Sequence, residues 1–163
     1  MKIGGVFIQG PNHLGPNHIE YPVVQFHIPR ELQNLDWTLS LYVLTEYYKN
    51  QSFFQHFSKG ILNNTDTPDS PIDNPHHITL TKDDIERGLY EVRVRLLNIT
   101  GIAELKKRPL ILFPHQQHAG LPCSDTAKSL ELDAKKYHLA AVLSCNDRAV
   151  RVTVSNLTTE EER

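Results

Sequence analysis

The 163-residue chain has a formal net charge of −2, with 39% hydrophobic and 22% charged residues. This composition is typical of a globular domain, and it lacks the surplus of basic residues that nucleic-acid binding requires. No apolar stretch approaches the roughly 20 residues of a membrane helix, and the N-terminus lacks the apolar run of a signal peptide. We therefore expect no nucleic acid partner and no membrane span, and either a cytoplasmic location or export by a non-classical route.

The N-terminal part, residues 1–35, is rich in Pro and contains the near-repeat GPNHLGPNHI. Pro fixes φ and Asn tolerates left-handed geometry, so the repeat predicts two consecutive turns that display His13 and His18. Two solvent turns are the simpler interpretation, and a ligand-binding loop for a metal or a sugar hydroxyl is the alternative. Short strands are expected at 2–9 and 21–28, which makes this region an arm with edge strands.

Alternation of apolar and polar residues marks the central strands. Residues 36–45 and 90–97 alternate in this way, as strands with one buried face do. Residues 137–145 and 149–155 predict a hairpin, because Asn146-Asp147 between them supplies turn residues. The inward-facing residues expected in the first two strands are Trp37, Leu39, Leu41, Val43, Tyr90, Val92, Val94 and Leu96. Many short strands separated by Pro and Gly predict an all-β antiparallel sandwich or barrel.

The remaining segments carry weaker patterns. Short strands are expected at 78–81 and 110–113, and a short helix at 124–132. Residues 81–88 begin like a capping box but end in a glycine, which predicts a turn or a single helical turn. Residues 60–75 are rich in Pro, Asp and Asn and are expected to form a surface loop.

The stretch from residue 77 to residue 101 resembles the late strands of bacterial immunoglobulin-like modules of surface and secreted proteins, and is similar to the fibronectin type III pattern. A short edge strand leads to a glycine corner, then a Tyr opens a strand with Val at alternate positions. The residues that carry the pattern are Gly88, Tyr90, Val92, Val94, Asn98 and Gly101. The resemblance implies an immunoglobulin-like antiparallel β-sandwich over 36–113, with Trp37 between the sheets.

The rest of the chain is expected to complete this domain. Residues 114–157 would contribute a loop and an extra C-terminal hairpin packed on the same domain, and 158–163 a disordered tail. The resemblance implies a non-enzymatic binding or adhesion module with a protein or glycan ligand. The sequence leaves homo-oligomerisation open.

Four residues suggest a metal site as an alternative. The pair His115 and His118 has a two-residue gap that lets both imidazoles face one ion, with Cys123 and then Cys145 as further zinc ligands. The irregular spacing and the lack of a Cys-x-x-Cys motif favour no cofactor, and a disulfide between the two cysteines is a second alternative. The chain also lacks a Gly-x-Ser-x-Gly elbow, a phosphate-binding loop and a His-Glu-x-x-His motif, so we expect no enzyme. A zinc-dependent enzyme or a structural zinc site that uses His115, His118 and Cys123 is the alternative.

Aromatic residues gather in the stretch LYVLTEYYKNQSFFQHF, residues 41–57. They are more numerous than a core strand and its loop require, so Tyr47 and Tyr48 are the candidate ligand-binding residues. Such rings stack on sugars or anchor a protein partner. The simpler, structural interpretation is that these rings cover one end of the sandwich. The alternative function for the protein is that of a carbohydrate-binding, lectin-like domain.

Overall fold

The computed structural model describes residues 4–9, 19–47, 52–55, 61–62, 71–72, 75–95, 112–120 and 132–155. The strands are β1 (Phe7–Gln9), β2 (Ile19–Glu20), β3 (Val23–Gln25), β4 (Trp37–Tyr47), β5 (Ser52–Gln55), β6 (Ile61–Leu62), β7 (Pro71–Ile72), β8 (His76–Thr79), β9 (Leu89–Glu91), β10 (Arg93–Arg95), β11 (Leu132–Cys145) and β12 (Arg148–Val154). Within these described ranges the helices are η1 (Arg30–Leu32) and α1 (Lys82–Arg87). The prediction of an all-β antiparallel sandwich is confirmed.

The first layer is a sheet in the order β12-β11-β4-β5, with β8 also paired to β4. β4 and β11 lie side by side along most of their length, in the register Trp37↔Cys145 to Thr45↔Tyr137. The predicted hairpin is confirmed as β11–β12, and its turn residues Asn146 and Asp147 have φ of 50° and 66°. Positive φ at both turn positions matches the twist of the flanking strands, and Asn and Asp tolerate it. The hairpin therefore belongs to the first layer.

The second layer is a ribbon that passes through two short ladders. β3 pairs with β9 in the register Val23↔Glu91, and β2 pairs with β10 in the register Glu20↔Val94. From the first pair to the second, one chain steps back by three residues and the other steps forward by three, as antiparallel pairing requires. The two ladders therefore share one register. Pro22 lies at the break because it has no N–H to donate, and its carbonyl accepts a 2.9 Å hydrogen bond from the residue between β9 and β10.

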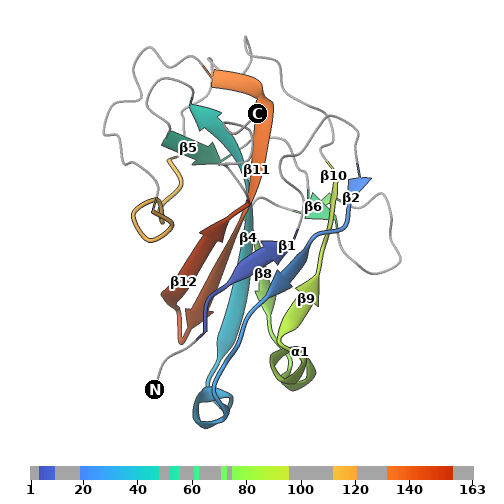
Figure 1. The fold of residues 1–163 in the computed structure, drawn as a ribbon, viewed down its shortest axis with the longest axis vertical. Coiled ribbons are helices and arrows are strands. Elements are labelled where there is room, and N and C mark those ends of the chain that lie inside the picture. Colours follow the sequence, from blue (N-terminus) through green and yellow to red (C-terminus); the bar gives the residue numbers. More distant parts are fainter. Residues whose placement is uncertain are drawn as a thin grey trace.

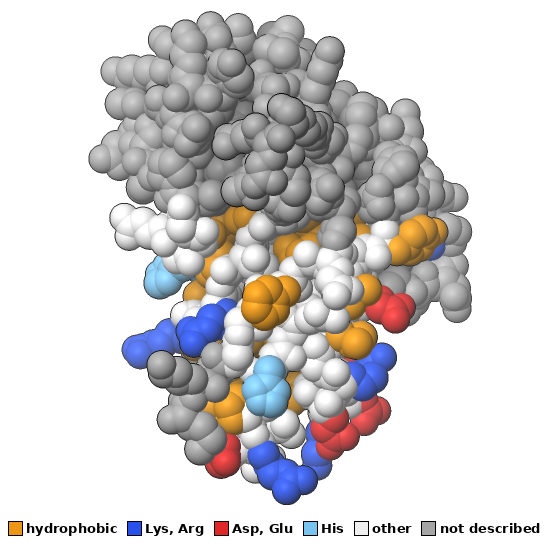
Figure 2. Space-filling view, in the orientation of Figure 1, with side chains coloured by type: hydrophobic (Ala, Val, Ile, Leu, Met, Phe, Trp, Pro, Cys, Tyr) orange, Lys and Arg blue, Asp and Glu red, His pale blue; other side chains and the backbone are white. Residues whose placement is uncertain are grey.

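Short strands extend this ribbon on both sides. β1 pairs with β3 in the register Phe7↔Gln25, while β6 pairs with β10 and β7 with β6. In Figure 1, β1 crosses in front of β4, so the second layer faces the viewer. Figure 2 therefore looks onto the outer face of this layer, where hydrophobic side chains lie in the middle and charged side chains lie mostly at the margins and the lower end.

The main core lies between the two layers. The first layer contributes one face of β4 and β11, and the second contributes the inner side of β3 and the residues near β9 and β10. The buried members are Val6, Val24, Phe26, Ile28, Trp37, Leu39, Leu41, Val43, Leu80, Ile85, Val92, Val94, Leu139, Ala141 and Leu143. Trp37 is 1% exposed and its indole N–H donates to the carbonyl of Leu32 at 2.8 Å, so the predicted Trp lies between the sheets with its polar atom satisfied.

The second face of β4 is also buried, which corrects the expectation of a half-buried strand. Tyr42 and Leu44 pack with Ala140 and Val142 of β11 under Phe113, which comes from the segment 112–120. The ring centroids of Tyr42 and Phe113 are 5.0 Å apart in an edge-to-face arrangement. Alternation alone underestimates burial here because the covering segment is distant in sequence.

The corner formed by α1 follows its predicted chemistry. The hydroxyl of Thr81 accepts from the N–H of Asp84, and the carboxylate of Asp84 accepts from the N–H of Thr81, which is the predicted capping box. Gly88 ends the helix at φ 72°. The six residues of α1 fill less than two turns, as the terminal glycine predicts.

Two expectations need correction. The expected loop at 60–75 contains β6 and β7, which pair with each other. The strand expected at 110–113 is only half described: Leu112 forms a bridge, and Phe113 leads into turns at 114–120. The expected strand at 90–97 is interrupted at Val92, where the ribbon passes from β9 to β10.

Other expectations lie largely outside the described residues. These are the repeat with His13 and His18, the tail at 158–163 and the helix expected at 124–132. Of that helix only Leu132 is described, and it belongs to β11. Across the part of the chain that the structure covers, no helix is long and apolar enough to cross a bilayer.

Candidate functional site

The predicted ligand-binding residues fall mostly outside the described residues. His13, His18 and Tyr48 are among those not described. The backbone of Tyr47 ends β4, opposite Ser52 of β5 and next to Leu132 of β11. This pairing places residue 47 at one end of the first layer. The predicted role of these four residues stays a prediction.

The predicted zinc pair lies over the second face of β4. His115 and His118 belong to the segment 112–120, whose Phe113 packs on Tyr42. The ring centroids of the two histidines are 6.3 Å apart. The ring of His115 also meets Phe113 at 5.7 Å and Tyr42 at 6.3 Å, both in edge-to-face arrangements. The structure therefore brings the two histidines together, with His115 packed against two aromatic rings.

Burial controls the charge state of this group. Burial, and after it the nearby His118, lowers the pKa of His115 below its ordinary value. Burial likewise raises the pKa of Tyr42. Near neutral pH the cluster therefore presents a neutral imidazole beside a protonated phenol, and a neutral imidazole can bind a metal.

A complete metal site is not formed by the described part of the chain. Within the ranges that the structure describes, no three His, Cys, Asp or Glu side chains come close enough to hold one ion. Cys123 is not described, and Cys145 is a free thiol on the core side of β11. Burial and the charge of Asp36 raise the pKa of the Cys145 thiol. Cys145 packs against the main core, whereas His115 contacts Tyr42 and Phe113 on the second face of β4, so Cys145 does not join the histidine pair.

A serine and a histidine meet on the same face of the first layer. The hydroxyl of Ser40 and Nδ1 of His77 are 2.7 Å apart, and the two residues are cross-strand neighbours in the β4–β8 ladder. Ser40 is only 5% exposed, so a substrate would have little access to its hydroxyl. The pair stabilises the pairing of β8 with β4, as cross-strand polar pairs do.

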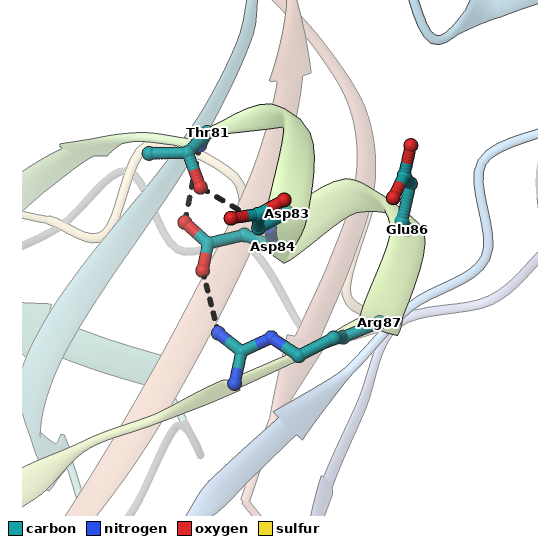
Figure 3. A pocket seen from close by; sticks show the side chains of 5 residues that line it. All are labelled: Thr81, Asp83, Asp84, Glu86 and Arg87. Carbon is teal, nitrogen blue, oxygen red and sulfur yellow. Dashed lines mark hydrogen bonds and ion pairs between the residues drawn. The ribbon is translucent and has the colours of Figure 1, made fainter.

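An open pocket lies at α1 and is lined by Thr81, Asp83, Asp84, Glu86 and Arg87. Figure 3 shows that Asp84 points to both Thr81 and Arg87, while Glu86 points away from them. The guanidinium of Arg87 donates to the Asp84 carboxylate at 2.8 Å. Burial alone would raise the pKa of Asp84, but the hydrogen bonds from Thr81 and the contact with Arg87 outweigh it and lower that pKa. The central groups of the pocket are thus engaged in holding the corner together.

The outer face of the second layer carries residues that the sequence reading did not select. Phe7 of β1 is 63% exposed, and Tyr21, next to β3, is 68% exposed. Both point away from the core, because their chain neighbours Val6 and Pro22 are buried. The alternation in the predicted strand at 21–28 was the signal that could have identified Tyr21 as an outward residue.

The surfaces that remain as candidates are therefore the histidine pair over β4 and the aromatic residues on the outer face of the second layer. The first offers imidazole ligands, and the second offers exposed rings. No family model matches this chain, and neither a curated protein nor a solved structure matches it.

Proposed function

We propose that this protein is a non-enzymatic binding or adhesion module that recognises a protein or another surface ligand. The observation that carries the proposal is the pair of aromatic side chains, Phe7 and Tyr21, held more than 60% exposed on one face of the second layer. Rings that are kept in water on a rigid sheet are suited to serve as anchors for a partner, because their burial on binding releases a large apolar area. The layer beneath them is fixed by the main core.

The resemblance to immunoglobulin-like modules is part of the proposal. Its support is local: Gly88 turns the chain at positive φ, and Val92 and Val94 then point into the core. In such modules the sandwich is a scaffold and the ligand binds on an exposed face or loop. A strand order determined by NMR that differs from that of immunoglobulin sandwiches would contradict this part.

The test of function is binding to immobilised ligands of both classes. The purified protein is passed over fibronectin, collagen and mucin surfaces and over a glycan array, in parallel with the double variant Phe7→Ala, Tyr21→Ala. We expect saturable binding to at least one ligand, and its loss in the double variant with the unfolding midpoint unchanged. Absence of saturable binding to every surface, or binding that the double variant retains in full, would contradict the proposal.

Zinc binding is a second candidate, and the adjacency of His115 and His118 favours it. The lowered pKa of His115 keeps its imidazole neutral and competent to bind a metal. Elemental analysis of protein purified without chelator tests this candidate. One zinc per chain, lost in His115→Ala, would support it, and a metal-free protein that takes up no added zinc would exclude it.

A further inference from the structure

The outer face of the second layer carries more than two exposed rings. We propose that it binds an extended, uncharged polysaccharide chain, for which Phe7 and Tyr21 are stacking platforms. This inference rests on the proposed binding function and names the surface and the chemical class of its ligand.

The chain through β3 alternates cleanly between the two sides of the layer. Every second residue from Pro22 onward is buried in the core, and every residue between them faces outward. The inward residues are Pro22, Val24, Phe26 and Ile28, and the outward ones are Tyr21, Val23, Gln25 and His27. Because the inward set is locked into the core, the outward side chains stand on a rigid base.

The ring of Phe7 reaches over a glycine. A Cβ placed on Gly5 would lie 2.9 Å from the ring atom Cζ of Phe7 and 3.1 Å from Cε2. The far end of the ring therefore lies over Gly5, in space that a larger residue would fill. Phe7 is nevertheless 63% exposed, so much of the side chain is open to solvent. An exposed aromatic ring can stack on a sugar.

The spacing of the two rings sets the size of the ligand. Phe7 lies opposite Gln25, and Tyr21 is four residues before Gln25 in the chain, so the two side chains start about 13 Å apart along β3. A monosaccharide cannot contact both at that distance. A linear oligosaccharide lying along β3 can contact both rings.

Polar residues near the two rings are suited to bind the hydroxyl groups of a sugar. The side chains of Gln9 and Gln25 each offer a donor and an acceptor, as sugar hydroxyls do. Gln9 is exposed and Gln25 is partly exposed. The outward residue between the two ring positions in the chain through β3 is Val23, with Gln9 opposite it, so apolar groups and amides lie side by side on this face. This arrangement fits a ligand with apolar ring faces and polar edges.

The charge of this face favours an uncharged ligand. The shared register places Glu91 and Arg93 one alternation apart in β9 and β10, opposite Val23 and Tyr21. One acidic and one basic residue leave this stretch of the face without net charge. An anionic or cationic polysaccharide would gain no electrostatic attraction here.

The probes are soluble β-glucan, xylan and galactomannan, with alginate as an anionic comparison, in affinity gel electrophoresis and isothermal titration. We expect at least one uncharged polysaccharide to retard the protein and alginate to have no effect. Phe7→Ala and Tyr21→Ala should each weaken binding about tenfold or more. Gly5→Ala should also weaken it, because the added methyl displaces the Phe7 ring while leaving both rings in the chain.

The matched control is Leu35→Ala, which removes another exposed hydrophobic side chain, 41% exposed, outside this face. It should leave affinity unchanged, and all variants should keep the parental unfolding midpoint. Failure of every uncharged polysaccharide to bind, binding of alginate alone, or affinity that survives both aromatic substitutions would overturn the inference. Binding to an immobilised protein that is lost in the double aromatic variant would also overturn it while leaving the proposed function intact.

Discussion

At the scale of single residues, the corner at Gly88 fixes how the ribbon of the second layer begins. Its φ of 72° lies in the left-handed region, and its carbonyl accepts a 2.8 Å hydrogen bond from the N–H of Phe26. A Cβ at this position would come within 2.7 Å of the carbonyl oxygen of Phe26. The glycine therefore serves both the turn and the close approach of the two strands.

Substitution of this glycine should be costly. We expect Gly88→Ala to lower the free energy of unfolding by about 2–4 kcal/mol, from left-handed strain together with the clash against the neighbouring strand. Gly120→Ala is the matched control, because Gly120 has φ 75° but nothing within 4 Å of its added Cβ. It should cost only about 1 kcal/mol. Urea denaturation of both variants makes the comparison, and equal losses would show that the close approach to Phe26 contributes nothing.

Residue-scale features of this kind were accessible from sequence because their causes are local. The capping box at Thr81 and the turn at Asn146-Asp147 depend on residues within a few positions of each other. The positive φ of Gly88 follows from its place after a short helix. The position of the Phe7 ring over Gly5 was not predictable in this way, because a glycine two residues away permits that position without requiring it.

At the scale of elements, the segment 112–120 behaves as a cover for one face of the first layer. Phe113 is 1% exposed and seals Tyr42 and Val142, while His115 packs against both aromatic rings. The cover thus includes an imidazole that is disfavoured in its charged form. Protonation of that imidazole should loosen the segment.

The pH dependence follows from the sign of this shift. The pKa of His115 is lower in the folded protein than in the unfolded chain, so its contribution to stability is present above the ordinary histidine pKa and is lost as pH falls through the folded value. We expect the urea midpoint to fall as the pH is lowered below the ordinary histidine pKa, and to fall less in His115→Gln. His118→Gln should also reduce the fall, because it removes the second cause of the shift. An identical fall in all three proteins would contradict this assignment.

Pairing between distant elements was much less predictable than the elements themselves. β4 and β11 were both expected as strands, but their mutual register depends on residues such as Trp37 and Cys145 that are far apart in sequence. The alternation in β4 predicted one buried face only, whereas Tyr42 and Leu44 are also buried, on the opposite face from Val43. The candidate face of the second layer was missed for the same reason, because Phe7 reaches it only through the pairing of β1 with β3.

At the scale of the whole molecule, the C-terminal hairpin holds the centre of the first layer. β11 lies between β4 and β12, and its residues Leu139, Ala141 and Leu143 are fully buried in the main core. The region expected to be a sandwich core, 36–113, therefore has its longest strand paired mainly with a strand outside it. The division of the chain into a core and an added hairpin stays a prediction.

A truncated fragment without the β11–β12 hairpin tests whether residues 1–113 fold on their own. We expect a fragment of residues 1–113 to lack cooperative unfolding and to give a poorly dispersed amide spectrum, because it loses the β11 residues of both core clusters and leaves one edge of β4 unpaired. The full chain, prepared in the same way, is the comparison. A well-dispersed spectrum from the fragment would instead support an independent domain ending near residue 113.

The central position of β11 has a consequence for biosynthesis. On the ribosome, roughly 100 residues must be made after β4 before β11 is complete, which takes roughly 5–20 s at ordinary elongation rates. During that time the edge of β4 that pairs with β11 is open, and the core lacks Leu139, Ala141 and Leu143. Newly made chains should therefore depend on chaperones, and slower translation after β4 should lower the soluble yield without any change in the stability of the finished protein.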